Sequence, residues 1–190
     1  MRHQQRIAAA VVATLLALLT LSACGDDEED PPAMPSSNGH PPMERMVDDY
    51  TEMRTAMVDA LDTELGRRGW DVTPNNPSMI RSKCRAEEDE RGERVSLPSY
   101  GFTGTYDAGD WKRAVELVWK VGRKHGFTHT GTIVDRPDDL EVYGEDDHGG
   151  RYIFGLAKNT VLGITTGCHR WTSTPTAESP KTEIPDFDKN

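Results

Sequence analysis

Hydrophobic residues are distributed along this chain in three different patterns, and each pattern predicts a different kind of structure. Residues 7–21 form one continuous apolar run. Residues 43–65 and 107–125 repeat apolar side chains every three or four positions, which is typical of amphipathic helices. Residues 128–168 contain runs in which apolar and polar side chains alternate, which is typical of strands with one buried face.

The first helical pattern begins at Met43 and meets possible stops at Gly66 and Gly69. Four of its apolar side chains are methionines, which are flexible enough to form an adaptable binding surface. Because they recur at helical spacing, the pattern favours a core role for them instead. The apolar stripe consists of Met43, Met46, Val47, Tyr50, Met53, Met57, Val58, Leu61 and Leu65.

The second helical pattern has clearer ends. Asp107 is a suitable N-cap, and Asp110 lies in the first turn, where a negative charge is favourable. Gly126 follows His125 at the position where a left-handed residue commonly ends a helix, and Phe127 can fold back over the last turn. The predicted apolar stripe consists of Trp111, Ala114, Val115, Val118 and Val121.

The other patterned segments predict strands. Trp70–Val72 begins a short strand, and 95–105 forms another in which Pro98 marks an edge or a bulge. Four later strands are expected at 128–135, 140–145, 151–157 and 160–168. The charged run 85–94 is interpreted as a solvated loop or a short helix. This order predicts an α+β fold, a two-layer sandwich whose mainly antiparallel sheet carries two helices packed on one face.

The N-terminal apolar run has the features of a lipoprotein leader. Arg2 and Arg6 precede it, and Leu21-Ser22-Ala23-Cys24 at its end is similar to a lipobox. We therefore expect a signal peptide over 1–23, removal of that segment, and acylation of Cys24 with diacylglyceryl and palmitate-type chains. The alternatives are an uncleaved anchor helix and an ordinary secretory leader. The predicted location is the extracytoplasmic face of the cell membrane.

Two polar segments flank the predicted domain. Residues 24–42 are acidic and then rich in proline, and they are expected to form a flexible tether. Residues 43–171 are expected to form a single globular domain, and residues 172–190 a disordered tail. The formal net charge of −10 argues against nucleic acid as a partner and against binding to anionic lipid surfaces. The remaining partner classes are the membrane through the lipid anchor, an envelope protein and a small ligand.

The chain has three cysteines, and lipidation would use Cys24. An even pair in an extracytoplasmic domain favours a structural disulfide between Cys84 and Cys168, with two free thiols as the alternative. No Cys-x-x-Cys spacing indicates redox chemistry.

Motifs for catalysis, metals and cofactors are weak. His125 and His129 lie on opposite sides of the expected helix end, and neither they nor His148 and His169 show a metal-ligand spacing. The acidic residues of 138–147 lack the ligand pattern of a calcium loop. There is no G-x-S-x-G or S-x-x-K motif and no glycine-rich nucleotide loop. We therefore expect no catalytic residue, no metal ligand and no cofactor.

Together, these features resemble the LppA-like lipoproteins of actinomycete envelopes. The shared features are the lipobox, the long helix ending near Gly69-Trp70, the run Tyr100-Gly101-Phe102, the helix start Asp110-Trp111-Lys112 and the ending 162–168, which reads LGITTGC. The resemblance covers most of 43–171 and implies a cell-surface lipoprotein in which Cys84 pairs with Cys168. It implies no activity.

Two hypotheses about function follow. The first is a non-enzymatic, membrane-anchored domain that binds a partner or a small ligand through its sheet or its methionine-bearing helix. The second is a metal-dependent or hydrolytic enzyme acting on envelope material, which requires some of the four histidines to converge with a carboxylate in a cleft. An accessory role in envelope assembly is not distinguished from the first by sequence.

Overall fold

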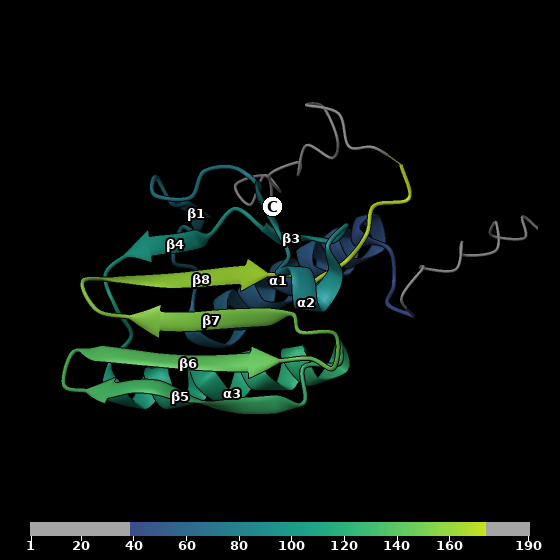
Figure 1. The fold of residues 1–190 in the computed structure, drawn as a ribbon. Coiled ribbons are helices and arrows are strands. Elements are labelled where there is room, and N and C mark those ends of the chain that lie inside the picture. Colours follow the sequence, from purple (N-terminus) through teal and green to yellow (C-terminus); the bar gives the residue numbers. More distant parts are fainter. Residues whose placement is uncertain (1–38, 174–190) are drawn as a thin grey trace, which may run out of the picture. The chain divides into compact units, whose positions relative to one another are not determined.

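The computed structural model describes residues 39–173 (Figure 1). The predicted leader, Cys24, most of the tether and most of the C-terminal tail lie outside these residues. The elements follow one another as α1 (Met43–Leu65), β1 (Asp71–Val72), β2 (Ile80–Lys83), α2 (Ala86–Asp89), β3 (Glu93–Ser96), β4 (Tyr100–Thr103), α3 (Ala108–Lys124), β5 (His129–Arg136), β6 (Asp139–Glu145), β7 (Arg151–Leu156) and β8 (Asn159–Thr165).

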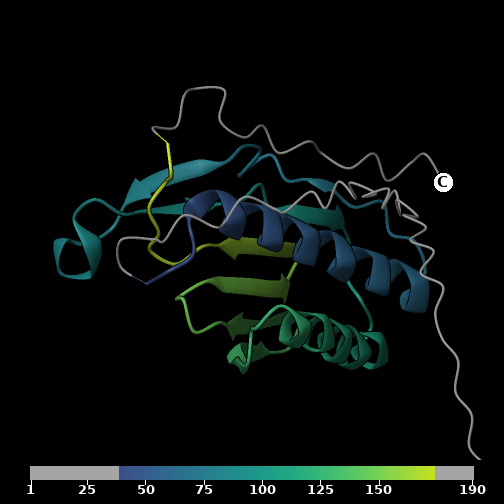
Figure 2. The same ribbon diagram turned by 90° about the vertical axis from the view of Figure 1, so that its right-hand side faces the viewer.

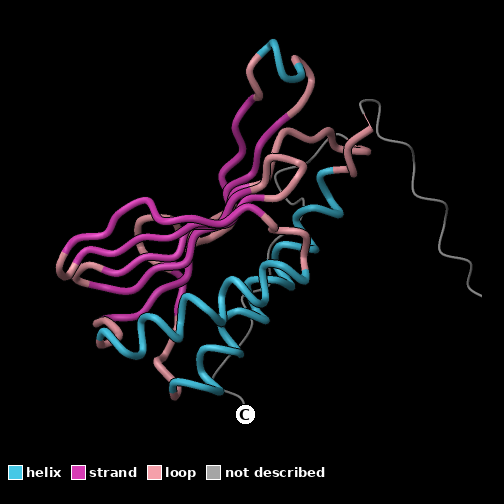
Figure 3. Tube along the Cα trace, turned by 90° about the horizontal axis from the view of Figure 1, so that it is seen from below, coloured by secondary structure: helices cyan, strands magenta, loops and turns pink. Residues whose placement is uncertain are grey.

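The strands form one sheet in the order β1-β4-β8-β7-β6-β5, and all of these pairs are antiparallel (Figure 1). α3 takes the chain from β4 to the far edge at β5, and a meander then returns it to β4. The hairpin of β2 and β3 joins the sheet where Ser96 pairs with Thr165. Figure 3 shows this hairpin projecting from the sheet with α2 at its tip.

Both long helices lie on the same side of the sheet (Figures 2 and 3). α1 contacts β8, α3 contacts β6, and the two helices contact each other. Tyr152, Phe154 and Leu162 are buried beneath them. The predicted α+β architecture, with two helices on one face of a mainly antiparallel sheet, is therefore confirmed.

The methionine stripe of α1 is part of the hydrophobic core. Met43, Met53 and Met57 are fully buried, and Met46 is nearly so. The sequence favoured this core role, and the alternative of a methionine-rich binding surface is wrong, because three of these side chains are fully buried and only Met46 reaches the edge of a groove.

α3 has the ends that its sequence predicts. Asp107 accepts hydrogen bonds at Oδ1 from the backbone N–H groups of Gly109 at 2.9 Å and Asp110 at 2.8 Å. At the other end Gly126 has φ +85°, a left-handed conformation that favours glycine. The N–H of Phe127 then donates to the carbonyl of Gly122 at 3.0 Å, and the Phe127 ring is buried over the helix end.

The segment around the charged run is more ordered than its sequence suggests. The sequence predicted either a solvated loop or a short helix here, and the structure has the short helix α2. The segment also contains the start of β3. β2 was not predicted, because all four of its side chains are exposed and it has no apolar alternation. The strand expected over 95–105 is divided by Leu97–Ser99, where Pro98 interrupts the pairing.

The sheet face opposite the helices is uncovered within the described residues. Ile153 and Val161 on this face are 36% and 37% exposed. A hollow of about 410 Å³ lies on this face and includes Arg94, Ser96, Arg151 and Thr165 in its lining. Within residues 39–173, none of the helices combines the length and the apolar character needed to cross a membrane.

Candidate functional site

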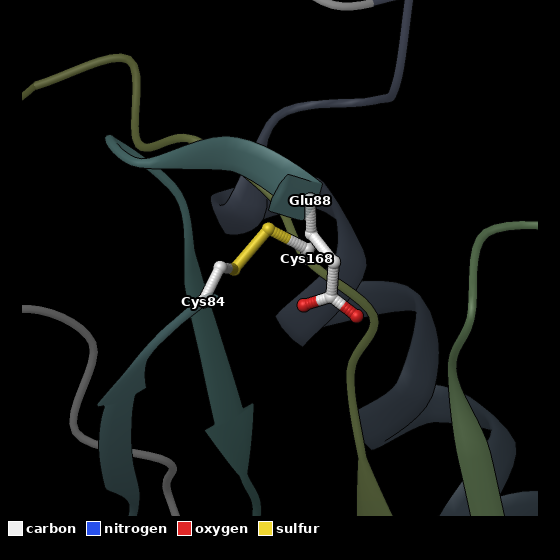
Figure 4. Close-up of side chains that lie close together, drawn as sticks. All are labelled: Cys84, Glu88 and Cys168. Atoms are coloured by element: carbon white, nitrogen blue, oxygen red, sulfur yellow. A yellow bond between two sulfur atoms is a disulfide. The ribbon is translucent and has the colours of Figure 1, made fainter. Parts of the chain in front are cut away.

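Cys84 and Cys168 are joined by the disulfide that the sequence predicts. Cys84 follows β2, Cys168 follows β8, and their Cα atoms are 5.9 Å apart (Figure 4). The Glu88 carboxylate lies beside the two sulfurs, and the three ligand atoms are within 4.8 Å of one another. Because metal binding by cysteine needs free thiolates, the disulfide makes this group a structural crosslink.

An ion pair lies next to the disulfide. Arg170 donates from Nε and Nη2 to the carboxylate of Asp89 at 2.6 and 2.7 Å, and the Asp89 side chain is only 4% exposed. These hydrogen bonds hold the pKa of Asp89 below its usual value, against the opposing effect of burial. The pair therefore attaches the segment after β8 to α2.

We expect this pair to make the domain sensitive to acid. The lowered pKa of Asp89 means that its contribution to stability is present above the unfolded-state pKa, near 3.8, and is lost as the pH falls through the folded-state value. Asp89→Asn should therefore lower the melting temperature at neutral pH. Below pH 4 the melting temperature of this variant should fall less steeply than that of wild type. Thermal melts from pH 7 to 3 would show this. Glu116→Gln, which changes an exposed carboxylate, is the control. Parallel curves for wild type and Asp89→Asn would contradict the expectation.

Three histidines from distant parts of the chain converge near this crosslink. His40 precedes α1, His148 lies in the turn between β6 and β7, and His169 follows Cys168. The ring centroids are separated by 5.6 Å for His40 and His148, 5.6 Å for His40 and His169, and 6.1 Å for His148 and His169. We call these three residues the histidine cluster.

His169 is the fixed member of the histidine cluster. Its side chain is fully buried, and Nδ1 lies 2.8 Å from the carbonyl oxygen of Pro41. A carbonyl oxygen only accepts, so Nδ1 carries the hydrogen and Nε2 carries the lone pair. Nε2 is buried and has no hydrogen-bond partner among the described residues. Burial lowers the pKa of His169, and the nearby His40 and His148 act in the same direction, against the opposing effects of the Pro41 hydrogen bond and of Asp146.

The backbone around Cys168 positions the rings of His40 and His148. Nδ1 of His40 lies 3.3 Å from the carbonyl oxygen of Cys168 and donates to it, so in the neutral ring Nε2 carries the lone pair. The backbone of His148 passes very close to Gly167. A Cβ atom added at Gly167 would lie only 1.8 Å from the His148 carbonyl oxygen. The absence of a side chain at Gly167 therefore allows His148 to approach His169.

The carboxylate of Asp146 organises the turn that carries His148. Its Oδ1 accepts from the N–H groups of His148 at 2.9 Å and Gly150 at 2.7 Å, and its Oδ2 accepts from the hydroxyl of Tyr50. Burial raises the pKa of Tyr50 far above its usual value, and the bond to Asp146 adds to this effect. Tyr50 on α1 therefore remains a neutral donor that connects the helix to the turn.

His148 also lines a groove of about 390 Å³ beside the cluster. Other groove residues include Arg45 and Tyr50 from α1, His125 at the end of α3, and Asp146. The groove gives solvent and small ligands a polar route to the edge of the histidine cluster.

The four histidines considered from sequence therefore separate. His148 and His169 come together, His125 lies in the adjoining groove, and His129 is mostly exposed with Nδ1 3.9 Å from Asp147. Sequence reasoning missed His40, which it assigned to the tether, and it missed the roles of Tyr50 and Asp146. No spacing signal could have identified His40, because its contacts depend on a residue 128 positions away.

Comparisons with known proteins identify the family but no activity. The LppA family, described as "Lipoprotein confined to pathogenic Mycobacterium", matches residues 27–170. The fold is similar to the crystal structure of the putative lipoprotein LppA from Mycobacterium tuberculosis, with 18% identity, a TM-score of 0.55, and coverage of 70% of this chain and 85% of that one.

The fold is also similar to the crystal structure of a DUF4853 family protein from Actinomyces odontolyticus, with 14% identity and a TM-score of 0.57. The match covers 80% of this chain and 81% of that one. At these identities the structural likeness shows the fold alone. No curated protein matches the sequence. The family match covers most of the chain, so this protein belongs to the LppA family of lipoproteins.

Proposed function

We propose that this protein is a lipid-anchored domain on the extracytoplasmic face of the cell membrane, and that it works by binding a ligand at the histidine cluster without converting it. Membership of a lipoprotein family and the lipobox at Leu21–Cys24 support the anchor. The disulfide supports an oxidising compartment, because disulfides persist outside the cytoplasm.

The observation that carries the binding role is the convergence of His40, His148 and His169 beside a groove. Core histidines usually have both ring nitrogens satisfied by hydrogen bonds, whereas Nε2 of His169 is buried without a partner among the described residues. A ligand that reaches this nitrogen would satisfy it. The histidine cluster therefore resembles a binding site more than a set of histidines packed in the core.

One observation also favours the second hypothesis, a metal-dependent hydrolase. His148 and His169 do converge with the carboxylate of Asp146 beside a groove. However, both oxygens of Asp146 already accept hydrogen bonds, so this carboxylate is poorly placed to act as a general base. Hydrolysis of a p-nitrophenyl ester by the zinc-supplemented chain, lost in His148→Ala, would favour the enzyme.

Mass spectrometry of the intact chain tests the proposed function. The full chain would be produced in a bacterium that processes lipoproteins, extracted in a mild detergent and measured under native conditions. We expect a chain that begins at acylated Cys24, lacks two hydrogens because of the disulfide, and carries a bound species. That species should be absent from His148→Ala and present in the control His129→Ala. An unlipidated chain would contradict the anchor, and a bound species that is equal in both variants would contradict binding at the cluster.

A further inference from the structure

We propose that His40, His148 and His169 together bind one divalent transition-metal ion of the zinc class. This inference rests on the proposed function and names the ligand of the same site. The three imidazoles provide three of the four donors that zinc commonly takes, and a water or an external donor would complete the shell.

The separation of the rings is close to what such an ion requires. With zinc–nitrogen bonds of about 2.0–2.1 Å and tetrahedral angles, the centroids of two imidazoles lie about 5 Å apart. The observed separations are 5.6, 5.6 and 6.1 Å. Three ligand atoms that bind one ion usually lie within about 4.8 Å of one another, and among residues 39–173 only Cys84, Glu88 and Cys168 do so. The nitrogens of the three histidines are therefore farther apart than a bound ion requires. Metal binding therefore requires the rings to turn and move slightly inward.

The burial of each ring indicates which ones move. His169 is fully buried and held through Nδ1 by Pro41, whereas His40 and His148 are only partly buried. We expect His169 to act as the fixed ligand, while the side chain of His148 rotates onto the ion and the ring of His40 shifts inward with its Nδ1 still directed at Cys168.

The hydrogen bonds of His169 and His40 follow the usual arrangement of metal-binding histidines. In such sites one ring nitrogen binds the metal, and the other donates to a carbonyl or carboxylate that fixes the tautomer. His169 donates from Nδ1 to Pro41, and His40 donates from Nδ1 to Cys168. Both rings therefore carry their lone pair on Nε2. For His169 that nitrogen is buried and has no partner among residues 39–173, so the ion would satisfy it.

The donor set selects the class of ion. Imidazole suits zinc, copper, nickel and iron, whereas calcium and magnesium prefer oxygen ligands. The nearby Asp146 carboxylate adds a negative charge that favours a cation, and its oxygens are held in the turn beneath His148. The sulfurs of Cys84 and Cys168 do not compete while they are bonded to each other.

Isothermal titration of the full, detergent-extracted chain with Zn²⁺ tests the inference. The protein is first treated with a chelator that is then removed, and reductants are left out. We expect one zinc per chain and a higher melting temperature when zinc is present. His148→Ala and, separately, His40→Ala should weaken binding at least about 100-fold, because losing even an outer-shell partner of a metal-bound histidine costs about 10–100-fold. The exposed His129→Ala is the control, and circular dichroism confirms that each variant is folded.

The outcomes separate this inference from the proposed function. Absence of stoichiometric zinc binding, or binding that both cluster variants leave unchanged, overturns the metal site. If the chelator-treated chain then still shows a non-metal species by native mass spectrometry, and His148→Ala removes it, the binding function stands with another ligand. If neither zinc nor any other species depends on His148, both proposals fail. Tighter binding of Cu²⁺ than of Zn²⁺ at the same histidines is the usual order for nitrogen ligands, so it supports the site.

Discussion

Opening the disulfide between Cys84 and Cys168 is expected to lower the free energy of unfolding by about 4.5 kcal/mol, which is the value that the chain-entropy treatment gives for a loop of this length. The two cysteines are separated by 84 positions in the sequence. The crosslink therefore lowers the conformational entropy of the unfolded chain by closing a long loop. Urea unfolding with and without a reductant measures the effect.

The two single variants Cys84→Ala and Cys168→Ala should each reproduce the loss, and reductant should then have no further effect on them. The loss should also extend to the histidine cluster. Cys168 precedes His169, and its carbonyl accepts from His40, so freeing Cys168 loosens two of the three rings. Unfolding curves that are the same with and without reductant would show that the crosslink adds no stability.

Gly167→Ala is expected to destabilise the domain by about 3 kcal/mol, at the upper end of the usual cost of overpacking. The added Cβ would lie 1.8 Å from the carbonyl oxygen and 2.7 Å from the carbonyl carbon of His148. Both are backbone atoms, so no side-chain rotation relieves the clash. The turn carrying His148 must then move away from His169, and we expect zinc binding to weaken as well.

Gly163→Ala in β8 is the matched control for this substitution. An added Cβ there would meet its nearest neighbour, Oγ of Ser99, at 3.4 Å, which is an acceptable contact. We expect its unfolding free energy to stay within about 1 kcal/mol of wild type, as for surface substitutions that touch nothing special. Equal melting temperatures for Gly167→Ala and Gly163→Ala would mean that the close approach at His148 has no structural importance.

The fold was predictable where local sequence and tertiary packing agree. α1 and α3 follow from their apolar stripes, and Asp107 and Gly126 fix the ends of α3. β7 and β8 follow from alternation, because every second side chain of each is buried toward the helices. β2 was missed because both of its faces are exposed, so pairing with β3 stabilises it without any apolar signal.

The candidate site was only partly predictable for a different reason. Cysteine pairing follows from counting, whereas the histidine cluster depends on three loops that only the folded sheet and helices bring together. His148 and His169 were both considered from the sequence, but their proximity depends on the approach of Gly167 to the turn after β6. His40 follows a proline-rich polar segment that resembles a tether, although the next residue, Pro41, binds His169.

Zinc K-edge X-ray absorption on the zinc-loaded full chain tests the central claim most directly, because it reports the atoms bound to the metal. We predict three imidazole nitrogens and one further light atom at about 2.0–2.1 Å, with the outer-shell scattering of imidazole rings and no sulfur. That imidazole scattering should decrease in His148→Ala and remain in His129→Ala. A sulfur shell at about 2.3 Å, or a shell of light atoms without imidazole, would show that the metal is held elsewhere and would contradict the histidine site.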